Sequence, residues 1–194
     1  MSHETVLSAL SALSKKRVYD TVPSEHAEHI HRETARTAII LQGSMIEHML
    51  EAQLTGRLSG LNSTEKGKLF GIEGPLGTFA NKTRIAKGLG IVDQDTAKQI
   101  DIVRAMRNAA AHCVDPISFN DAAIKNAVTQ LAPEGMRAKI SKLSEQKRRT
   151  YFELTCMSIC KLLISGSHRQ TDEERLKIVL TSALPDASPD TPVE

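Results

Sequence analysis

Arg107 is the residue that most constrains the chemistry of this chain, because it falls on the apolar side of a predicted helix. At about 100° of rotation per residue, it projects between Ile100 and Val103, beside Ala111. A guanidinium on a packing face is costly unless a carboxylate or several other acceptors meet it. Arg107 therefore either extends to water or pairs with an acid from another helix. We predict an ion pair with Glu47; a solvent-facing Glu47 is the alternative.

A narrow polar strip on the same helix supplies further candidate residues. It consists of Asp101, Arg104, Asn108 and His112. The broad apolar side consists of Ile102, Val103, Met106, Ala109 and Ala110. Arg104 joins Arg107 among the residues expected to bind a partner, and the apolar side is expected to pack in a core.

A glycine-spaced loop precedes this helix, with glycines at Gly71, Gly74 and Gly77. Such spacing resembles a phosphate-binding loop, but no Gly-Lys-Ser/Thr follows and no strand precedes. We therefore predict a tight structural connection, with Gly74, Pro75 and Gly77 shaping the turn and Leu76 and Phe79 docked into the core.

Two cations begin the short helical pattern that follows the loop. Lys82 and Arg84 form a modest positive surface there, and an anion could bind against the free amide groups of the helix start. A binding module for a small anionic ligand is therefore one functional hypothesis.

The most basic stretch runs from Met136 to Arg149. Its cations are Arg137, Lys139, Lys142, Lys147, Arg148 and Arg149, against Glu145 alone. Such a run could follow a nucleic-acid backbone, with Lys147, Arg148 and Arg149 as the contacts. No aromatic residues interleave with it, so a solvated basic face is the simpler interpretation.

Metal, cofactor and disulfide chemistry have little support. His26 and His29 share a helix face, but no further ligand completes a site by spacing. The three cysteines are Cys113, Cys156 and Cys160, an odd and sparse set typical of reduced thiols in a cytoplasmic protein. We predict no metal and no cofactor.

The elements that must position these residues are helices. The chain has 194 residues, 3% aromatic residues and a formal charge of +2, which favours one all-α core and gives no global signal for nucleic acid. The pattern predicts a helix over 1–17, a long helix from Pro23–Ser24 to Leu58, and one helical turn near Thr64–Leu69. It then predicts a helix that ends at Gly88 and Gly90, one from Asp93 or Asp95 to Asp115-Pro116, and one from Asn120 or Asp121 to Leu131. The last two predicted helices are Tyr151–Ser165 and a helix from the Thr171/Glu174 capping box to Leu184. We predict a single-domain bundle of six to seven helices.

The chain boundaries complete this organisation. Residues 1–184 are expected to form the helical domain, and 185–194, rich in proline and acids, a disordered tail. No apolar run approaches the roughly 20 residues that cross a bilayer, so we expect no membrane association and a cytoplasmic location.

The segment from Arg36 to His112 resembles the mannitol operon repressor (MtlR/MltR) family. The similarity lies in the GPLGTF loop (Gly74–Phe79), the helix bearing Lys82, the close Arg104–His112 and the acid Glu47. The resemblance implies a helical regulator, which in the name-giving members controls transcription for carbohydrate uptake. No DNA-reading helix-turn-helix is recognisable, so we expect action chiefly through a protein partner.

A looser similarity links Arg107-x4-His112, with Asn108, to HEPN-type helical domains. It implies a metal-independent endoribonuclease in which Arg107 steadies a phosphate, His112 moves a proton and Glu47 orients the arginine. Five positions along a helix separate the two side chains by ~140°, so a homodimer or a break in the helix would have to complete the site. We favour the regulator and assign no catalytic residue.

Overall fold

The computed structural model describes residues 34–165 and Leu180, and these residues form seven α-helices and no strand. The helices are α3 (Ala35–Arg57), α4 (Ser63–Phe70), α5 (Phe79–Gly88), α6 (Gln94–His112), α7 (Ala122–Leu131), α8 (Glu134–Ile140) and α9 (Glu145–Ser165). The predicted all-α bundle is therefore confirmed over this part of the chain.

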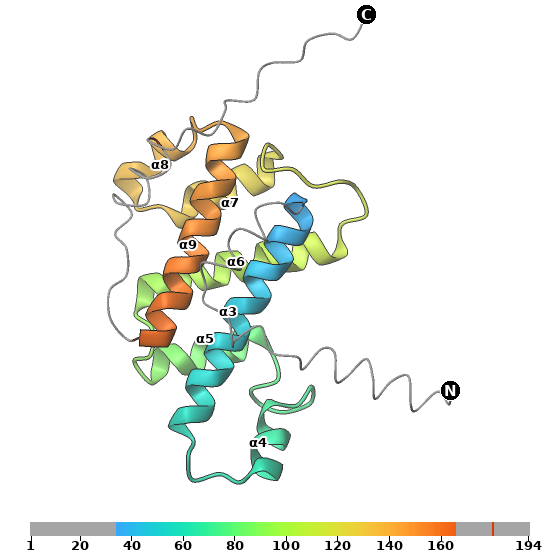
Figure 1. Ribbon diagram of the computed structural model, residues 1–194, viewed down its shortest axis with the longest axis vertical. Helices are drawn as coiled ribbons and strands as arrows, with labels where there is room; N and C mark the ends of the chain where they lie inside the picture. Colours follow the sequence, from blue (N-terminus) through green and yellow to red (C-terminus); the bar gives the residue numbers. More distant parts are fainter. Residues whose placement is uncertain (1–33, 166–179, 181–194) are drawn as a thin grey trace, which may run out of the picture.

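Helices α3, α6 and α9 form the centre of the bundle. Helix α3 packs against both α6 and α9, and α5 fills the angle between α3 and α6. In Figure 1, α3 and α9 run beside each other with α6 crossing them, while α7 and α8 gather at one end and α4 lies at the other. Residues far apart in sequence therefore meet along α3.

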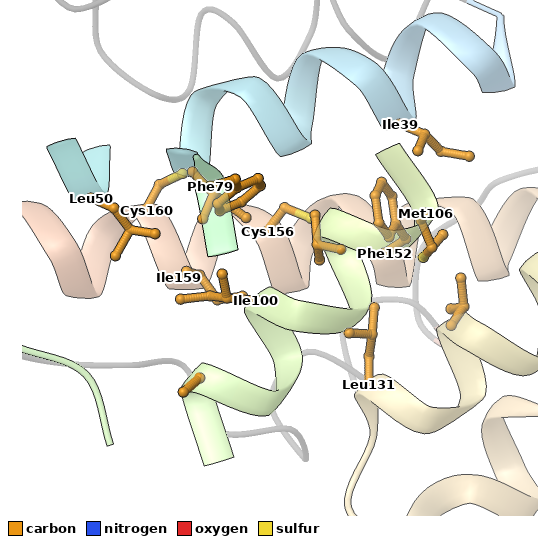
Figure 2. Close-up of a cluster of buried hydrophobic side chains, with 14 of the residues drawn as sticks. Ile39, Leu50, Phe79, Ile100, Met106, Leu131, Phe152, Cys156, Ile159 and Cys160 are labelled. Atoms are coloured by element: carbon orange, nitrogen blue, oxygen red, sulfur yellow. The ribbon is translucent and has the colours of Figure 1, made fainter. Parts of the chain in front are cut away.

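A continuous apolar core lies between these helices. Figure 2 shows Ile39 and Leu50 of α3, Phe79 of α5, Ile100 and Met106 of α6, Leu131 of α7 and Phe152, Cys156, Ile159 and Cys160 of α9 converging. Each fully buried aliphatic or aromatic side chain of this kind contributes about 2 kcal/mol. Burial on α3 recurs every three or four residues, which is the spacing of one helix face.

Local capping sets most helix ends where the sequence predicts them. Asp93 caps α6 through its side chain, which accepts from the amide of Thr96, and Gly88 ends α5. Helix α7 spans the predicted range up to Leu131. Helix α4 exceeds the predicted single turn, because Asn62 and Glu65 form a reciprocal capping box.

Two helix starts were predicted wrongly. Helix α3 begins at Ala35 rather than at Pro23–Ser24, because Thr34 is extended and caps the first turn. Helix α9 begins at Glu145 rather than at Tyr151, so it includes the last five residues of the basic stretch. The predicted helix over 1–17, His26, His29, the Thr171/Glu174 capping box and the 185–194 tail lie outside the described residues.

No described helix combines the length and the apolar character that crossing a membrane requires.

Candidate functional site

Helix α3 presents two carboxylates, one turn apart, towards α5 and α6. Glu47 and Glu51 are four residues apart, so they share one side of the helix. Glu51 Oε2 lies 2.8 Å from Lys82 Nζ, and Glu47 Oε1 lies 3.2 Å from the same nitrogen. The second oxygen of Glu47 lies 3.4 Å from Arg107 Nη2. We call Glu47, Glu51, Lys82 and Arg107 the charge cluster.

The charge cluster is neutral and only partly shielded from water. The Lys82 side chain is 6% exposed, that of Glu47 18%, and that of Arg107 33%. Two cations and two carboxylates balance, so the desolvation cost of each charge is offset by its partners. The predicted Arg107–Glu47 ion pair is confirmed, and the solvent-facing alternative for Glu47 is excluded.

Helices α3 and α6 approach each other closely where Arg107 reaches Glu47. A Cβ added at Gly43 would lie 2.8 Å from Arg107 Cβ and 2.9 Å from Arg107 Cγ. Only a glycine leaves room for the arginine stem at this crossing. The glycine therefore helps to set where the guanidinium meets Glu47.

Lys82 does not form the positive surface that the sequence predicts. Its residue is 5% exposed and its ammonium is held by two carboxylates, so it offers no charge to an external anion. The orientation follows from α5, whose inward face consists of Phe79, Lys82, Thr83 and Ala86. Arg84 remains exposed on the opposite side. The prediction of a shared Lys82–Arg84 anion surface was wrong.

The glycine loop has the structural role predicted for it. A Cβ at Gly74 would collide with the carbonyl oxygens of Lys68 and Leu69, and one at Gly77 with that of Gly71. The loop thus folds back on the end of α4 and delivers Leu76 and Phe79 to the core, where they are 6% and 5% exposed. Pro75 is exposed and its carbonyl accepts from the Asn81 side chain.

Arg36 joins the start of α3 to the end of α6, a contact that sequence reasoning missed. Its guanidinium donates to the carbonyl oxygens of Ala110 at 2.8 Å, Cys113 at 2.6 Å and Asp115 at 2.6 Å. The first of these belongs to the last turn of α6, where carbonyls lack helical partners. Nothing in the sequence marks backbone oxygens as acceptors, so no local signal identifies this contact.

The structure separates Arg107 from the other residues of the ribonuclease alternative. Arg107 turns towards Glu47, whereas Asn108 and His112 are exposed on α6. No hydrogen bond joins Arg107 to His112, and α6 stays helical through His112. Arg104 lies nearby in an exposed pair with Asp101, at 3.2 Å. Within one copy of the chain, these residues form no joint phosphate-binding and proton-transfer site.

The basic stretch is not one continuous surface. Residues 141–144 separate α8 from α9, and Arg148 is 2% exposed, so its prediction as a surface contact was wrong. Its nitrogens donate to the carbonyl oxygens of Phe119 and Leu143 and to Asn120 Oδ1, at 2.6, 2.5 and 2.9 Å. Arg149 is also enclosed, in a pair with Glu153 at 2.8 Å.

Among the described residues, no cluster of three or more His, Cys, Asp or Glu side chains could hold a metal ion. Cys113, Cys156 and Cys160 form no disulfide; Cys156 and Cys160 are buried, and Cys113 is exposed. Burial raises the pKa of the Cys160 thiol from 9.0 to about 12, so it stays protonated.

Comparison with known proteins identifies the fold. No protein-family model matches the chain, and no curated protein matches it. Among solved structures, the X-ray structure of the MtlR–HPr complex from Escherichia coli contains a matching chain with a TM-score of 0.58 and 15% sequence identity. The match covers 73% of this chain and 97% of that chain. At this identity the similarity establishes the architecture and not the activity. The chain therefore has the fold found in the MtlR–HPr complex.

Proposed function

We propose that this chain is a regulatory protein that acts in transcriptional control by binding a protein partner, rather than by catalysing a reaction. The observation that carries the proposal is the shared fold with a protein solved in complex with HPr. Fold alone transfers function weakly, so the interior chemistry and the surface must also support it.

The interior chemistry supports a scaffold more than an active site. Lys82 and Arg107, the cations that a phosphate-handling site would use, are bound to Glu47 and Glu51 inside the bundle. An enzyme of the ribonuclease type would need one of them aimed at its substrate. Here both hold three helices together.

The outward face of α5 supports a position for the partner. Ile85 of α5 and Leu89, the residue directly after the helix, are 43% and 49% exposed. The amide of Leu89 still donates to the carbonyl oxygen of Ile85, so the two residues lie on one side. Arg84 and Lys87 are exposed beside them. Apolar side chains flanked by cations suit a protein surface that presents apolar residues within an acidic rim. We place the contact with HPr or a similar protein on this α5 face.

The test is a binding titration between the purified chain and HPr from the same organism, measured by calorimetry. We expect a complex that the double variant Ile85→Glu/Leu89→Glu weakens at least about tenfold, because each substitution places a charged carboxylate at the apolar centre of the contact. Val114→Glu is the matched control, since Val114 is 95% exposed but lies beyond the end of α6. No binding at about 100 µM, together with no specific protein recovered in pull-downs, would overturn the proposal.

The ribonuclease alternative has one observation in its favour: Asn108 and His112 are exposed on α6, and the Arg107 side chain is 33% exposed. A homodimer could bring a second His112 to this surface. Incubation with mixed RNA and EDTA decides the matter. Cleavage that His112→Ala abolishes, with the fold intact by circular dichroism, would replace the regulatory proposal; no cleavage at micromolar protein removes the alternative.

Nucleic-acid binding through Met136 to Arg149 remains a prediction with a reduced set of contacts. Lys139 and Lys142 are exposed, whereas Arg148 and Arg149 are engaged inside the protein. Salt-sensitive DNA retention should therefore depend on Lys139 and Lys142. Neutralising both tests this without disturbing Arg148.

A further inference from the structure

A cavity of about 370 Å³ lies between the first half of α6 and the junction of α7 with α8. This volume falls in the range of small-molecule sites. Ile102, Leu131 and Ala132 contribute apolar lining, and charged and amide side chains line the cavity as well. None of the residues of the charge cluster lines it, so it is separate from the site described above.

Two hydrogen bonds fix the wall formed by the α7–α8 junction. Gln99 is 7% exposed, and its Nε2 donates to the carbonyl oxygen of Leu131 at 2.7 Å. Arg137 Nε donates to the carbonyl oxygen of Ala132 at 3.2 Å. These bonds tie the junction to α6 and α8, so the cavity is preformed rather than created by a ligand.

The charges around the cavity are unequally engaged. Lys98 and Asp95 pair with each other at 3.0 Å. Arg137 and Glu134 also line the cavity, but neither forms an ion pair within the part of the chain that the structure describes. The bond from Nε holds the Arg137 guanidinium in place while its two terminal nitrogens stay available. Within the described residues, one guanidinium and one carboxylate that lack an ion-pair partner thus line the same cavity.

We propose that this cavity binds an α-amino acid with an apolar side chain. The Arg137 terminal nitrogens receive the ligand carboxylate in the two-pronged geometry that guanidinium favours. Glu134 accepts from the ligand ammonium group, and the ligand side chain packs on Ile102 and Leu131. A ligand with a single charge would leave either Arg137 or Glu134 without a partner, so the pair selects a zwitterion. This site goes beyond the proposed function and does not depend on it.

The test uses L-leucine as the probe, with isocaproate, which lacks the amine, and isoamylamine, which lacks the carboxylate. Binding to the full chain is followed by calorimetry and by the amide signals of Ile102 and Ala132 in NMR spectra. We expect leucine to bind and each analogue to bind at least about tenfold more weakly, because each loses one charged contact.

Variants separate the two contacts. Glu134→Gln should weaken leucine about tenfold and leave isocaproate unchanged, whereas Arg137→Lys should weaken both. Glu73→Gln, at an exposed carboxylate between α4 and α5, is the control and should change neither. If Arg137→Lys fails to fold because the bond to Ala132 is lost, Glu134→Gln decides, since Glu134 is exposed. Equal affinity for leucine and isocaproate, or no binding at about 10 mM leucine, would overturn the proposal.

Discussion

Arg107 and Arg148 each bring a guanidinium into the packed part of the bundle, but they are neutralised in different ways. Arg107 meets the carboxylate of Glu47 on another helix and keeps 33% of its side chain exposed. Arg148 is 2% exposed and donates hydrogen bonds to three neutral oxygens, two of them backbone carbonyls. An exposed edge tolerates a charge pair, whereas the enclosed position needs several acceptors around one cation.

The electrostatic consequence differs accordingly. Burial lowers the pKa of Arg148 below its ordinary value, and the nearby Glu145 carboxylate only partly opposes this. Because the ordinary pKa of arginine is so high, the guanidinium still stays protonated at any working pH. Arg148 is therefore a permanent charge that fastens α9 to the residues before α7. Its Nε and the Ser144 hydroxyl are buried without a partner in the described residues.

The largest effect should come from Arg148→Met, which keeps the length of the side chain but removes its donors. The carbonyl oxygens of Phe119 and Leu143 would then be buried without hydrogen bonds. We expect a loss of about 4 kcal/mol in the free energy of unfolding, measured by urea denaturation. Lys142→Met, at an exposed cation, is the control and should cost less than about 0.5 kcal/mol. Equal costs would mean that the two cations are equally solvated.

Glu47→Gln should have the next largest effect, because it leaves Arg107 and Lys82 with one carboxylate between them. We expect a loss of about 3 kcal/mol, smaller than for Arg148 because Glu51 still holds Lys82. Asp101→Asn removes an acid from the exposed pair with Arg104 and should cost about 0.5 kcal/mol. A cost for Glu47→Gln as small as the control would show that the charge cluster is effectively solvated.

Gly43→Ala sharpens the comparison without touching a charge. The added methyl group would meet the Arg107 stem and push the guanidinium from Glu47, at about 2 kcal/mol. The double variant Gly43→Ala/Glu47→Gln should lose less stability than the sum of the losses in the two single variants, because the second change acts on an ion pair that is already broken. Gly56→Ala, where nothing lies within 4 Å, should instead stabilise α3 by up to about 1 kcal/mol. Strict additivity would contradict this account.

Cys160→Ala should have the smallest effect, and it tests whether water reaches the buried side of α9. Its pKa is raised from 9.0 to about 12, so the folded state keeps the thiol proton that the unfolded chain releases. Stability is complete below the unfolded pKa and falls as pH rises through this window. Between about pH 8 and pH 10, the wild type should lose about 1.4 kcal/mol more than Cys160→Ala. Parallel losses in urea denaturation would indicate a hydrated thiol.

Local rules were sufficient for most helices and for Arg107, but not for Arg148. Periodicity and the Asp93 cap set α6, and an arginine on its packing face implied an acid, which is Glu47. The same rule would have found Lys82, since it lies three residues after Phe79 on the inward face of α5.

Arg148 was predicted as a surface contact, and its burial was not foreseen because the start of α9 was placed too late. Once the helix begins at Glu145, Arg148 lies four residues before Phe152, on a side that the core already requires. Two of its three acceptors, like all those of Arg36, are backbone oxygens brought close only by tertiary structure. Side-chain identity cannot reveal such partners, so these contacts were beyond the reach of sequence patterns.

Arg36 has a mechanical consequence for the pair of helices that it joins. It fastens the beginning of α3 to the residues that follow α6, and Glu47 fastens the middle of α3 to Arg107. The two attachment points are eleven residues apart on α3, or about 16 Å along its axis. Two separated contacts oppose both translation and rotation of α3 relative to α6. We therefore expect α3 and α6 to move together as one rigid body.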